Sequence, residues 1–398
     1  MTDDEPIIRI AAKGDGVTAS GRHVPGTVPG DLVRPDGTTE AGPHRAVPPC
    51  RHFGVCGGCQ LQHADEEALR QFVTDRVTNA AAGHGIEPDV LLETHLSPPR
   101  SRRRASLRGS SSAGGVILGF NERASNRIVN LRECHVLLPS LFDLVAPLRA
   151  MFWELRGKAP LEVWLTQGDQ GIDCVIKGLP AETLAEREQL VDFAQTHTLA
   201  RLALDDGYGI ECLWEPQPVT ISLGGVAVGL PPDSFLQATL DGERRLTEDV
   251  ATFLSDALTV ADLFSGLGTF AFALPSTTRV LAVEAARDAH LACKTAAGRA
   301  RRQVYAMHRD LFRNPLRAEE LDRFDAVVLD PPRAGAREQI AQIAASNVSR
   351  VAYVSCNPAT WARDAAMLCE AGFRLAILRP VGQFRWSTHV ELTSLFVR

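Results

Sequence analysis

The stretch from Asp262 to Phe270, DLFSGLGTF, follows an apolar run and places two glycines where the next helix should begin. Glycines at such a strand-to-helix turn let the backbone approach a ligand closely. Glu284 lies 18 residues after Gly266 and ends the next apolar run, where a carboxylate can accept hydrogen bonds from both hydroxyls of a ribose. Because Phe270 and Ala271 replace the third glycine of the dinucleotide fingerprint, a pyrophosphate is poorly accommodated. The turn therefore favours S-adenosylmethionine over NAD, with a purely structural turn as the alternative.

The chain around this turn alternates short apolar, β-branched runs with helical segments over residues 240–398. This rhythm is typical of a mostly parallel, doubly wound α/β sheet. Combined with the turn that favours S-adenosylmethionine, it predicts a Rossmann-like methyltransferase domain. The last strand is a candidate for antiparallel pairing. The expected strands are 258–264, 279–284, 304–308, 324–330, 350–356, 373–378 and 391–397.

The preceding part of the chain has a mixed pattern. A helix is expected within residues 63–84, where Leu69, Phe72, Val73 and Val77 share one face. Further on, the pattern predicts a central α+β domain. Its expected strands are 116–120, 127–131, 161–165 and 172–176, and its expected helices are 139–155 and 181–198. We therefore expect three domains: a small β unit (1–45), a cysteine-rich segment with the central domain (46–235), and the methyltransferase domain (236–398).

Composition narrows the class of protein. The 398 residues are 45% hydrophobic and 23% charged, which excludes a wholly disordered chain, a collagen-like fibre and a small disulfide scaffold. No run of about 18 apolar residues occurs, and the acidic start lacks an apolar signal region, so no membrane association is expected. A cytoplasmic location follows. The net charge is −6, yet five arginines lie between residues 100 and 108, and we predict that Arg102, Arg103 and Arg104 contact RNA phosphates.

Cysteines form the next signal. Three of the nine, Cys50, Cys56 and Cys59, lie within ten residues, and Cys134 follows much later. In a chain without a secretory signal, metal binding or catalysis is favoured over disulfides. Four cysteines can hold zinc or an iron–sulfur cluster. Zinc sites usually present two close pairs, whereas only one close pair is present here.

Two further strand ends carry chemistry. Asp330 begins the segment DPPR, in which Arg333 stands where methyltransferases of base amino groups place an aromatic residue, so N-methylation of a base is disfavoured. Cys356 lies in SCNP, ahead of Asn357 as helix cap and Pro358 as first helical residue. A helix N-terminus should favour the Cys356 thiolate. The alternative is a buried cysteine that acts as a small apolar side chain.

These motifs together resemble the RNA uracil-5-methyltransferase family. The resemblance rests on DLFSGLGTF, DPPR, SCNP and the later HVE, and it extends over about residues 6–398. The segment PPCRHFGVCGGCQ, with Cys134, resembles the iron–sulfur branch of that family, which implies a 4Fe–4S cluster. Residues 13–17 and 24–31 resemble the first half of an RNA-binding barrel of the TRAM type.

The resemblance also implies roles for individual residues. Cys356 would be the nucleophile that adds to carbon 6 of uracil, and Glu391, in HVE, the base that removes the proton from carbon 5. The cofactor contacts would be Gln237, Phe264, Thr269, Glu284, Asp310 and Asp330, with Thr269 standing where the family often has asparagine. The cluster ligands would be Cys50, Cys56, Cys59 and Cys134.

The resulting expectation is an S-adenosylmethionine-dependent methyltransferase that modifies carbon 5 of a uridine in RNA. The iron–sulfur branch favours 23S ribosomal RNA, and transfer RNA is the alternative substrate. Two other classes stay open: a non-catalytic iron–sulfur protein that binds RNA, and a methyltransferase of another target, such as carbon 5 of cytosine. No obligate protein partner is implied.

Overall fold

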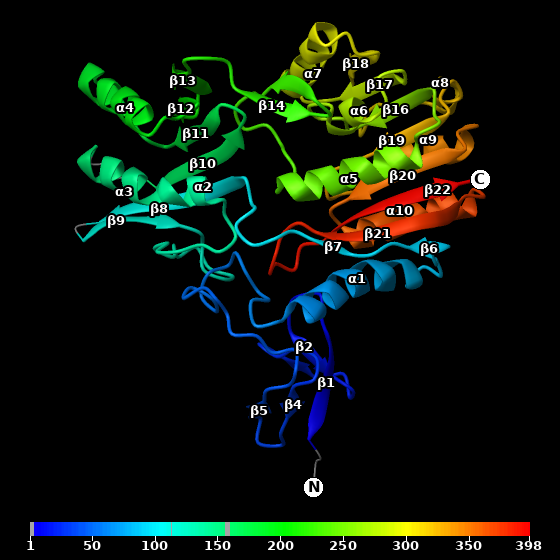
Figure 1. Ribbon diagram of the computed structural model, residues 1–398, viewed down its shortest axis with the longest axis horizontal. Helices are drawn as coiled ribbons and strands as arrows, with labels where there is room; N and C mark the ends of the chain where they lie inside the picture. The colour runs from blue at the N-terminus through cyan, green and yellow to red at the C-terminus, as the bar shows by residue number, and fades with distance from the viewer. Residues whose placement is uncertain (1–3, 113, 156–159) are drawn as a thin grey trace.

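The computed structural model describes residues 4–112, 114–155 and 160–398. Figure 1 shows three sheet-containing parts: a small blue one at the N-terminus, a cyan-to-green one in the middle of the chain, and a large one that ends in red. No helix in these described ranges has the length and apolar character needed to cross a membrane.

The largest part is a nine-stranded sheet, and it confirms the predicted doubly wound α/β fold. Its strand order is β18-β17-β16-β19-β20-β22-β21-β6, with β7 also paired to β21. Only β22 is antiparallel to its neighbours, β20 and β21, which settles the pairing of the last strand. The strands of the expected repeat are β16 (Thr259–Leu263), β17 (Arg279–Glu284), β18 (Val304–His308), β19 (Ala326–Leu329), β20 (Arg350–Ser355), β21 (Arg374–Gly382) and β22 (Glu391–Val397).

Helices cover both faces of this sheet. Because successive side chains of a strand point to opposite faces, Val260 joins one apolar cluster while Ala261 and Leu263 join the other. The first cluster includes residues of α5 (Leu240–Phe253), α6 (Thr269–Ala273) and α7 (Arg287–Arg299). The second includes residues of α1 (Glu66–Ala82), α8 (Ala318–Leu321), α9 (Arg337–Ala345) and α10 (Pro358–Glu370).

The position of α1 differs from the expected domain boundaries. The predicted helix is confirmed, and its side chains Val77 and Ala81 pack in the second cluster of the large sheet. After it, β6 (Val90–Leu91) and β7 (His95–Leu96) pair with β21. The hairpin of β14 (Thr220–Leu223) and β15 (Val226–Gly229) also packs in the first cluster. An apolar face predicts that a segment is buried but not against which partner. The sequence alone therefore groups these segments with the central domain, which they adjoin along the chain.

The central part is a six-stranded sheet of order β13-β12-β11-β10-β8-β9. Here β10 and β11 form the predicted antiparallel hairpin. Residues 127–131 do not form the expected strand: Val129 and Leu131 donate single backbone hydrogen bonds to the end of β9 and the residue after it, without a regular ladder. The elements are β8 (Arg104–Ser112), β9 (Gly115–Gly119), α2 (Pro139–Asp143), α3 (Val145–Glu154), β10 (Leu161–Gly168), β11 (Gly171–Lys177), α4 (Leu184–Thr196), β12 (Arg201–Asp205) and β13 (Ile210–Trp214).

The N-terminal part is a small five-stranded sheet of order β3-β2-β1-β4-β5. Its strands are β1 (Glu5–Ile10), β2 (Gly16–Thr18), β3 (His23–Val24), β4 (Leu32–Val33) and β5 (Thr39–Glu40). The carboxylate of Asp31, fully buried, accepts hydrogen bonds from the backbone of Val28 and Gly42 and pairs with Arg45. This ion pair fixes the start of the cysteine-bearing loop to the small sheet.

Candidate active site

The fold gathers the predicted chemistry at one edge of the large sheet. Parallel strands end at a common edge, where ligands of open α/β sheets bind. Asp262 lies near the end of β16, Glu284 ends β17, Asp330 follows β19 and Cys356 follows β20. Glu391 begins the antiparallel strand β22, so it lies at this same edge.

The glycine turn after β16 has the backbone conformation that its sequence predicted. Gly266 and Gly268 have φ values of 54° and 92°, in the left-handed region that glycine tolerates. Phe264, at φ 63°, shares this strained region. The Glu284 carboxylate accepts hydrogen bonds from the backbone nitrogen atoms of Gly266, at 2.9 Å, and Ala286, at 2.6 Å. The Glu284 carboxylate, which is expected to bind the ribose, is therefore held against the turn before any ligand binds.

Buried acceptors beside this turn fit a cationic ligand. Oδ2 of Asp262 accepts from the backbone nitrogen of Ala271 at 2.9 Å, but Oδ1 and the hydroxyl of Ser265 have no hydrogen-bond partner among the described residues. Burial raises the pKa of Asp262 well above its ordinary value. A bound cation would satisfy Oδ1 and favour its charged form. Together with Glu284, these groups fit the ammonium and ribose of S-adenosylmethionine.

Four of the other predicted cofactor residues occupy nearby positions, and one lies apart. Phe264 packs on Phe312 with ring centroids 5.3 Å apart, and Oδ1 of Asp310 accepts from the backbone nitrogen of Phe312 at 3.0 Å. The buried side chain of Gln237 donates to Oδ2 of Asp330 at 3.3 Å. Thr269 instead lines a cavity of ≈ 540 Å³ on the side of α5 and β14.

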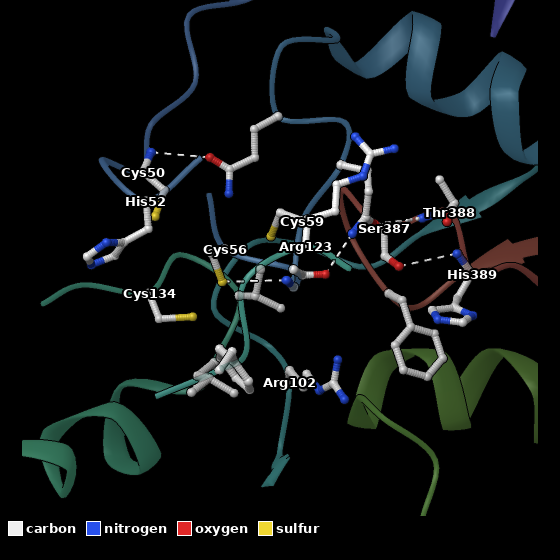
Figure 2. A pocket seen from close by; sticks show the side chains of 18 of the residues that line it. Cys50, His52, Cys56, Cys59, Arg102, Arg123, Cys134, Ser387, Thr388 and His389 are labelled. Carbon is white, nitrogen blue, oxygen red and sulfur yellow. Dashed lines mark hydrogen bonds between the residues drawn. The ribbon is translucent and has the colours of Figure 1, made fainter. Parts of the chain in front are cut away.

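The reaction side of the edge opens into a cavity of ≈ 800 Å³. Cys356, Glu391, Arg333 and His389 line it together with all four predicted cluster cysteines. Figure 2 shows the cysteines gathered on one side of this cavity and His389 on the other. The structure thus brings the predicted catalytic and cluster residues to one cavity.

Cys356 is less acidic than the sequence suggested. Asn357 caps α10 by accepting from the backbone nitrogen of Ala359 at 3.2 Å, as predicted. Nevertheless, the pKa of Cys356 is raised to about 11, first by burial and then by the neighbouring carboxyls of Glu391 and Asp330. These effects outweigh both the helix N-terminus and the cation of Arg333, so the resting side chain is a neutral thiol.

The two carboxyls beside Cys356 also titrate unusually. Burial and the neighbouring Asp330 raise the pKa of Glu391 to about 8, although a hydrogen bond from Gln383 opposes that shift. Burial of the Asp330 carboxyl raises its pKa to about 7. A cation bound beside Asp330 would lower both pKa values. Glu391 can therefore exchange a proton near neutral pH, as a general base requires.

Gln383 is a site residue that the sequence did not reveal. It lies one residue beyond β21, and its Nε2 atom donates to Oε1 of Gln237 at 2.7 Å. In the register of β21 on β22, Val381 pairs with Glu391, so Gln383 is the diagonal neighbour of that acid. Only the pairing of these strands could have identified it.

The arginine prediction is wrong for one of its three residues. Arg103 is only 3% exposed, forms an ion pair with Glu243 of α5, and donates to the backbone oxygen of Gln237 at 3.0 Å. It therefore joins the central sheet to the large sheet instead of meeting phosphates. Arg102 lies over Phe384, 5.1 Å from the ring centroid, and lines the large cavity. Arg104 lies over Phe235 at 5.6 Å.

The cysteine-rich loop is tied to the segment that carries Cys134. Backbone groups of Gly57 and Arg132 make hydrogen bonds of 2.9 Å with Asn121 and His52, respectively. Within residues 4–112, 114–155 and 160–398, no three His, Cys, Asp or Glu side chains are placed to hold a metal ion. The four cysteines line one side of the large cavity (Figure 2). A four-iron cluster would need one thiolate at each of its irons, and these four cysteines are the residues that would supply them.

Comparisons with known proteins identify the family of this chain. The family described as tRNA (Uracil-5-)-methyltransferase matches residues 232–398. An uncharacterised RNA methyltransferase of Zymomonas mobilis is 49% identical, over 98% of this chain and 99% of that protein. The 23S rRNA (uracil(1939)-C(5))-methyltransferase RlmD of Halomonas elongata is 34% identical, over 87% of this chain and 76% of that protein.

A solved structure supports the fold over the whole chain. The tRNA (uracil-54, C5)-methyltransferase of Pyrococcus abyssi, in complex with S-adenosyl-L-homocysteine, superposes with a TM-score of 0.76 and covers 99% of both chains. Its sequence identity is 20%, so this match concerns the fold alone. The relative of Halomonas elongata, together with the matched family over residues 232–398, shows that this chain belongs to the RNA uracil-5-methyltransferase family.

Proposed function

We propose that this protein transfers a methyl group from S-adenosylmethionine to carbon 5 of a uridine in RNA. The observation that carries the proposal is the position of Cys356 relative to Glu391. The antiparallel register of β20 on β22 ends with the pair Ser355–Leu392, so the next pair sets Cys356 opposite Glu391. Both side chains face the large cavity, with the carboxyl of Asp330 close enough to affect the pKa of each.

A thiol opposite a carboxyl suits methylation of a carbon atom that is a weak nucleophile. Cys356 reacts as its thiolate, after its thiol proton has passed to solvent in the large cavity. Its sulfur then forms a bond to carbon 6 of uracil, and the electron pair displaced towards carbon 5 makes that carbon nucleophilic. S-adenosylmethionine, when bound, supplies the methyl group as an activated sulfonium. Glu391 then takes the proton from carbon 5, and the bond between sulfur and carbon 6 breaks. This sequence regenerates Cys356 and leaves 5-methyluridine.

Arg333 assists the first step. Its backbone oxygen accepts hydrogen bonds from Asn357, at 2.9 Å, and Thr360, at 3.1 Å, so the DPPR segment is fixed to the start of α10. Its cation lowers the pKa of Cys356, against the effect of the carboxyls. Arg333 thus favours the thiolate at the position where the addition requires it.

We propose RNA with a flipped-out uridine as the substrate, because carbon 6 is unreachable inside a helix stack. The relative of Halomonas elongata supports 23S ribosomal RNA, and the fold shared with the Pyrococcus abyssi enzyme supports transfer RNA as the second candidate. Sequence identity favours ribosomal RNA. A cytoplasmic location follows from either substrate.

We further propose a 4Fe–4S cluster held by Cys50, Cys56, Cys59 and Cys134. Its support is the common cavity and the hydrogen bonds that tie the two cysteine-bearing segments together. Its role would be structural, because it would join the loop after the N-terminal sheet to the central sheet. The proposed domains are the N-terminal unit (1–45), the cysteine-rich and central region (46–235) and the methyltransferase region (236–398), with residues 66–96 packed on the last.

The test of the main proposal uses ribosomal and transfer RNA from a strain that lacks the gene. The purified protein, S-adenosylmethionine and each RNA are incubated, and 5-methyluridine is mapped by mass spectrometry. We expect one new methylated uridine in 23S ribosomal RNA. Methylation of transfer RNA alone would select the second candidate, and the absence of 5-methyluridine from both would overturn the proposal.

A further inference from the structure

The glutamine that follows β21, Gln383, lies beside the proposed base, because the register of β21 on β22 makes it the diagonal neighbour of Glu391. We propose that Gln383 is a positioning residue, which holds the Glu391 carboxylate ready to accept the proton from carbon 5. This inference rests on the proposed function, because it takes Glu391 as the base. It adds a residue to the reaction machinery through contacts of this chain alone.

The amide of Gln383 is held in one orientation. It is 1% exposed, and its Oε1 atom accepts from the backbone nitrogen of Thr239, at 3.4 Å, next to the start of α5. The Nε2 atom donates to Oε1 of Gln237 at 2.7 Å, and the amide is close enough to Glu391 to lower the pKa of that carboxyl. All polar atoms of the amide have partners, so the side chain cannot rotate without losing hydrogen bonds.

The packing around Gln383 is equally specific. A Cβ atom added to Gly242 of α5 would lie 2.8 Å from Cβ of Gln383 and 3.0 Å from its Oε1 atom. Gly242 thus leaves the space that Gln383 occupies. A side chain that is fixed on both sides can hold its hydrogen-bond partner in a fixed position.

The two glutamines form a bridge between two acids. Gln237 donates to Asp330 on the cofactor side, and Gln383 donates to Gln237 and is the diagonal neighbour of Glu391 on the substrate side. An amide donor favours the ionised form of a carboxyl, which is the form that accepts a proton. Gln383 thereby opposes the two effects that keep Glu391 protonated, its burial and the neighbouring Asp330.

Other titratable and charged groups also surround Glu391, and the test must hold them constant. They line the two cavities that reach this carboxyl or adjoin it at the sheet edge. They are Asp330, Arg333, Cys356, His389, Arg102, Arg104, Glu162, Asp173 and Asp233. None of them is changed when Gln383 is replaced by a side chain of similar size.

The experiment compares Gln383→Met with a matched control, Gln339→Met. Gln339 is also 1% exposed and also bonded through both ends of its amide, to the backbone of Leu316, but it lies in α9 away from the site. Single-turnover rates of methyl transfer and of product release from the protein are measured between pH 6 and pH 10. Melting temperatures of both variants report any loss of stability.

For Gln383→Met we expect the pH dependence of product release to move up by about one pH unit, because Glu391 loses the donor that favours its charge. At pH 7 a covalent RNA–protein adduct should accumulate about tenfold over the wild type, and it should disappear at pH 9 to 10. Gln383→Asn, whose amide is too short to reach both partners, should show the same shift. Gln339→Met should lower stability but leave the pH profile unchanged.

Two outcomes separate this inference from the proposed function. If Glu391→Gln forms no methylated RNA adduct, the assignment of the base fails. If Glu391→Gln traps the adduct while Gln383→Met and Gln383→Asn keep the wild-type pH profile, Gln383 is only a packing residue and the inference is wrong.

Discussion

The two sides of the active edge are built in different ways. The cofactor side comes from consecutive strand ends, Asp262, Glu284, Asp310 and Asp330, and its hydrogen bonds mostly join neighbouring turns of one sheet. The substrate side combines the loop of residues 50–59, Arg102, Cys134 and the segment 383–391 around one cavity. A side built from local turns can be disturbed one contact at a time. A side assembled from distant segments depends on the packing of the whole molecule.

The largest expected effect concerns the reaction itself and does not depend on how either side of the active edge is assembled. Cys356→Ala should lower methyl transfer by about 10⁴-fold or more and form no adduct, because it removes the nucleophile. Glu391→Gln should accumulate a methylated RNA adduct that survives denaturing electrophoresis and is absent from the double variant. The control is Cys369→Ala, because Cys369 is also partly buried but lies within α10. Substantial turnover by Cys356→Ala would contradict the assigned role.

The next prediction tests whether the substrate side depends on its distant segments. Cys134→Ser should lose most of the iron and sulfide of anaerobically purified protein, because one cluster ligand is removed. Binding of S-adenosylmethionine should change little, since the acids of the cofactor side lie at strand ends of the large sheet and not on that loop. Cys212→Ser, at an exposed cysteine of β13, should keep the wild-type iron content. One zinc and no iron in the wild-type protein would exclude the cluster.

A third prediction concerns the joint between the central and large sheets. Arg103→Met should lower the free energy of unfolding by about 3 to 5 kcal/mol, because Glu243 would be left buried without its partner. Arg103→Met with Glu243→Gln should recover part of that loss. The exposed pair Arg108–Glu162 supplies the control, and Arg108→Met should cost less than about 1 kcal/mol. Denaturant unfolding measures all of these variants, and equal effects of Arg103→Met and Arg108→Met would contradict the buried bridge.

The smallest expected effect, taken per pH unit, is a dependence of stability on pH to which Glu391 contributes. The folded-state pKa of Glu391, about 8, is above the ordinary value of 4.5, so the folded protein holds a proton that the unfolded chain releases. Stability should therefore fall as the pH rises from about 4.5 to 8, by at most about 1.4 kcal/mol per pH unit for this group. Glu391→Gln should flatten this slope in denaturant titrations at pH 5, 6.5 and 8. An unchanged slope would mean that Glu391 is already ionised at neutral pH.

The sequence predicted the cofactor side better than the substrate side, for a physical reason. The glycine turn, Glu284 and the N-cap Asn357 act through neighbours within one or two elements, so their spacing predicts their geometry. The Cys356–Glu391 pair was identified through family motifs, although its facing arrangement depends on the pairing of β20 with β22. Such pairings have no local signal.

The residues that were missed or misplaced all depend on distant packing. Arg103 lies in a basic run that predicts solvent exposure, but Glu243 of α5 neutralises it in the interior. Only the register of β21 on β22 identifies Gln383 as a neighbour of Glu391. The pKa of Cys356 departs from the prediction because burial, followed by two carboxyls from other strands, opposes the effect of the helix N-terminus.

The docking of α1 against α10 and β21 also has a consequence for synthesis of the chain. The apolar side chains Val77 and Ala81 leave the ribosome about 280 residues before their partners in α10. At about 5 to 20 residues per second, this interval lasts roughly 15 to 55 s. The strands β6 and β7 are synthesised a similar time before β21, the strand with which they pair. The large sheet therefore closes only when the last residues are made, and an early segment must stay shielded from aggregation until then.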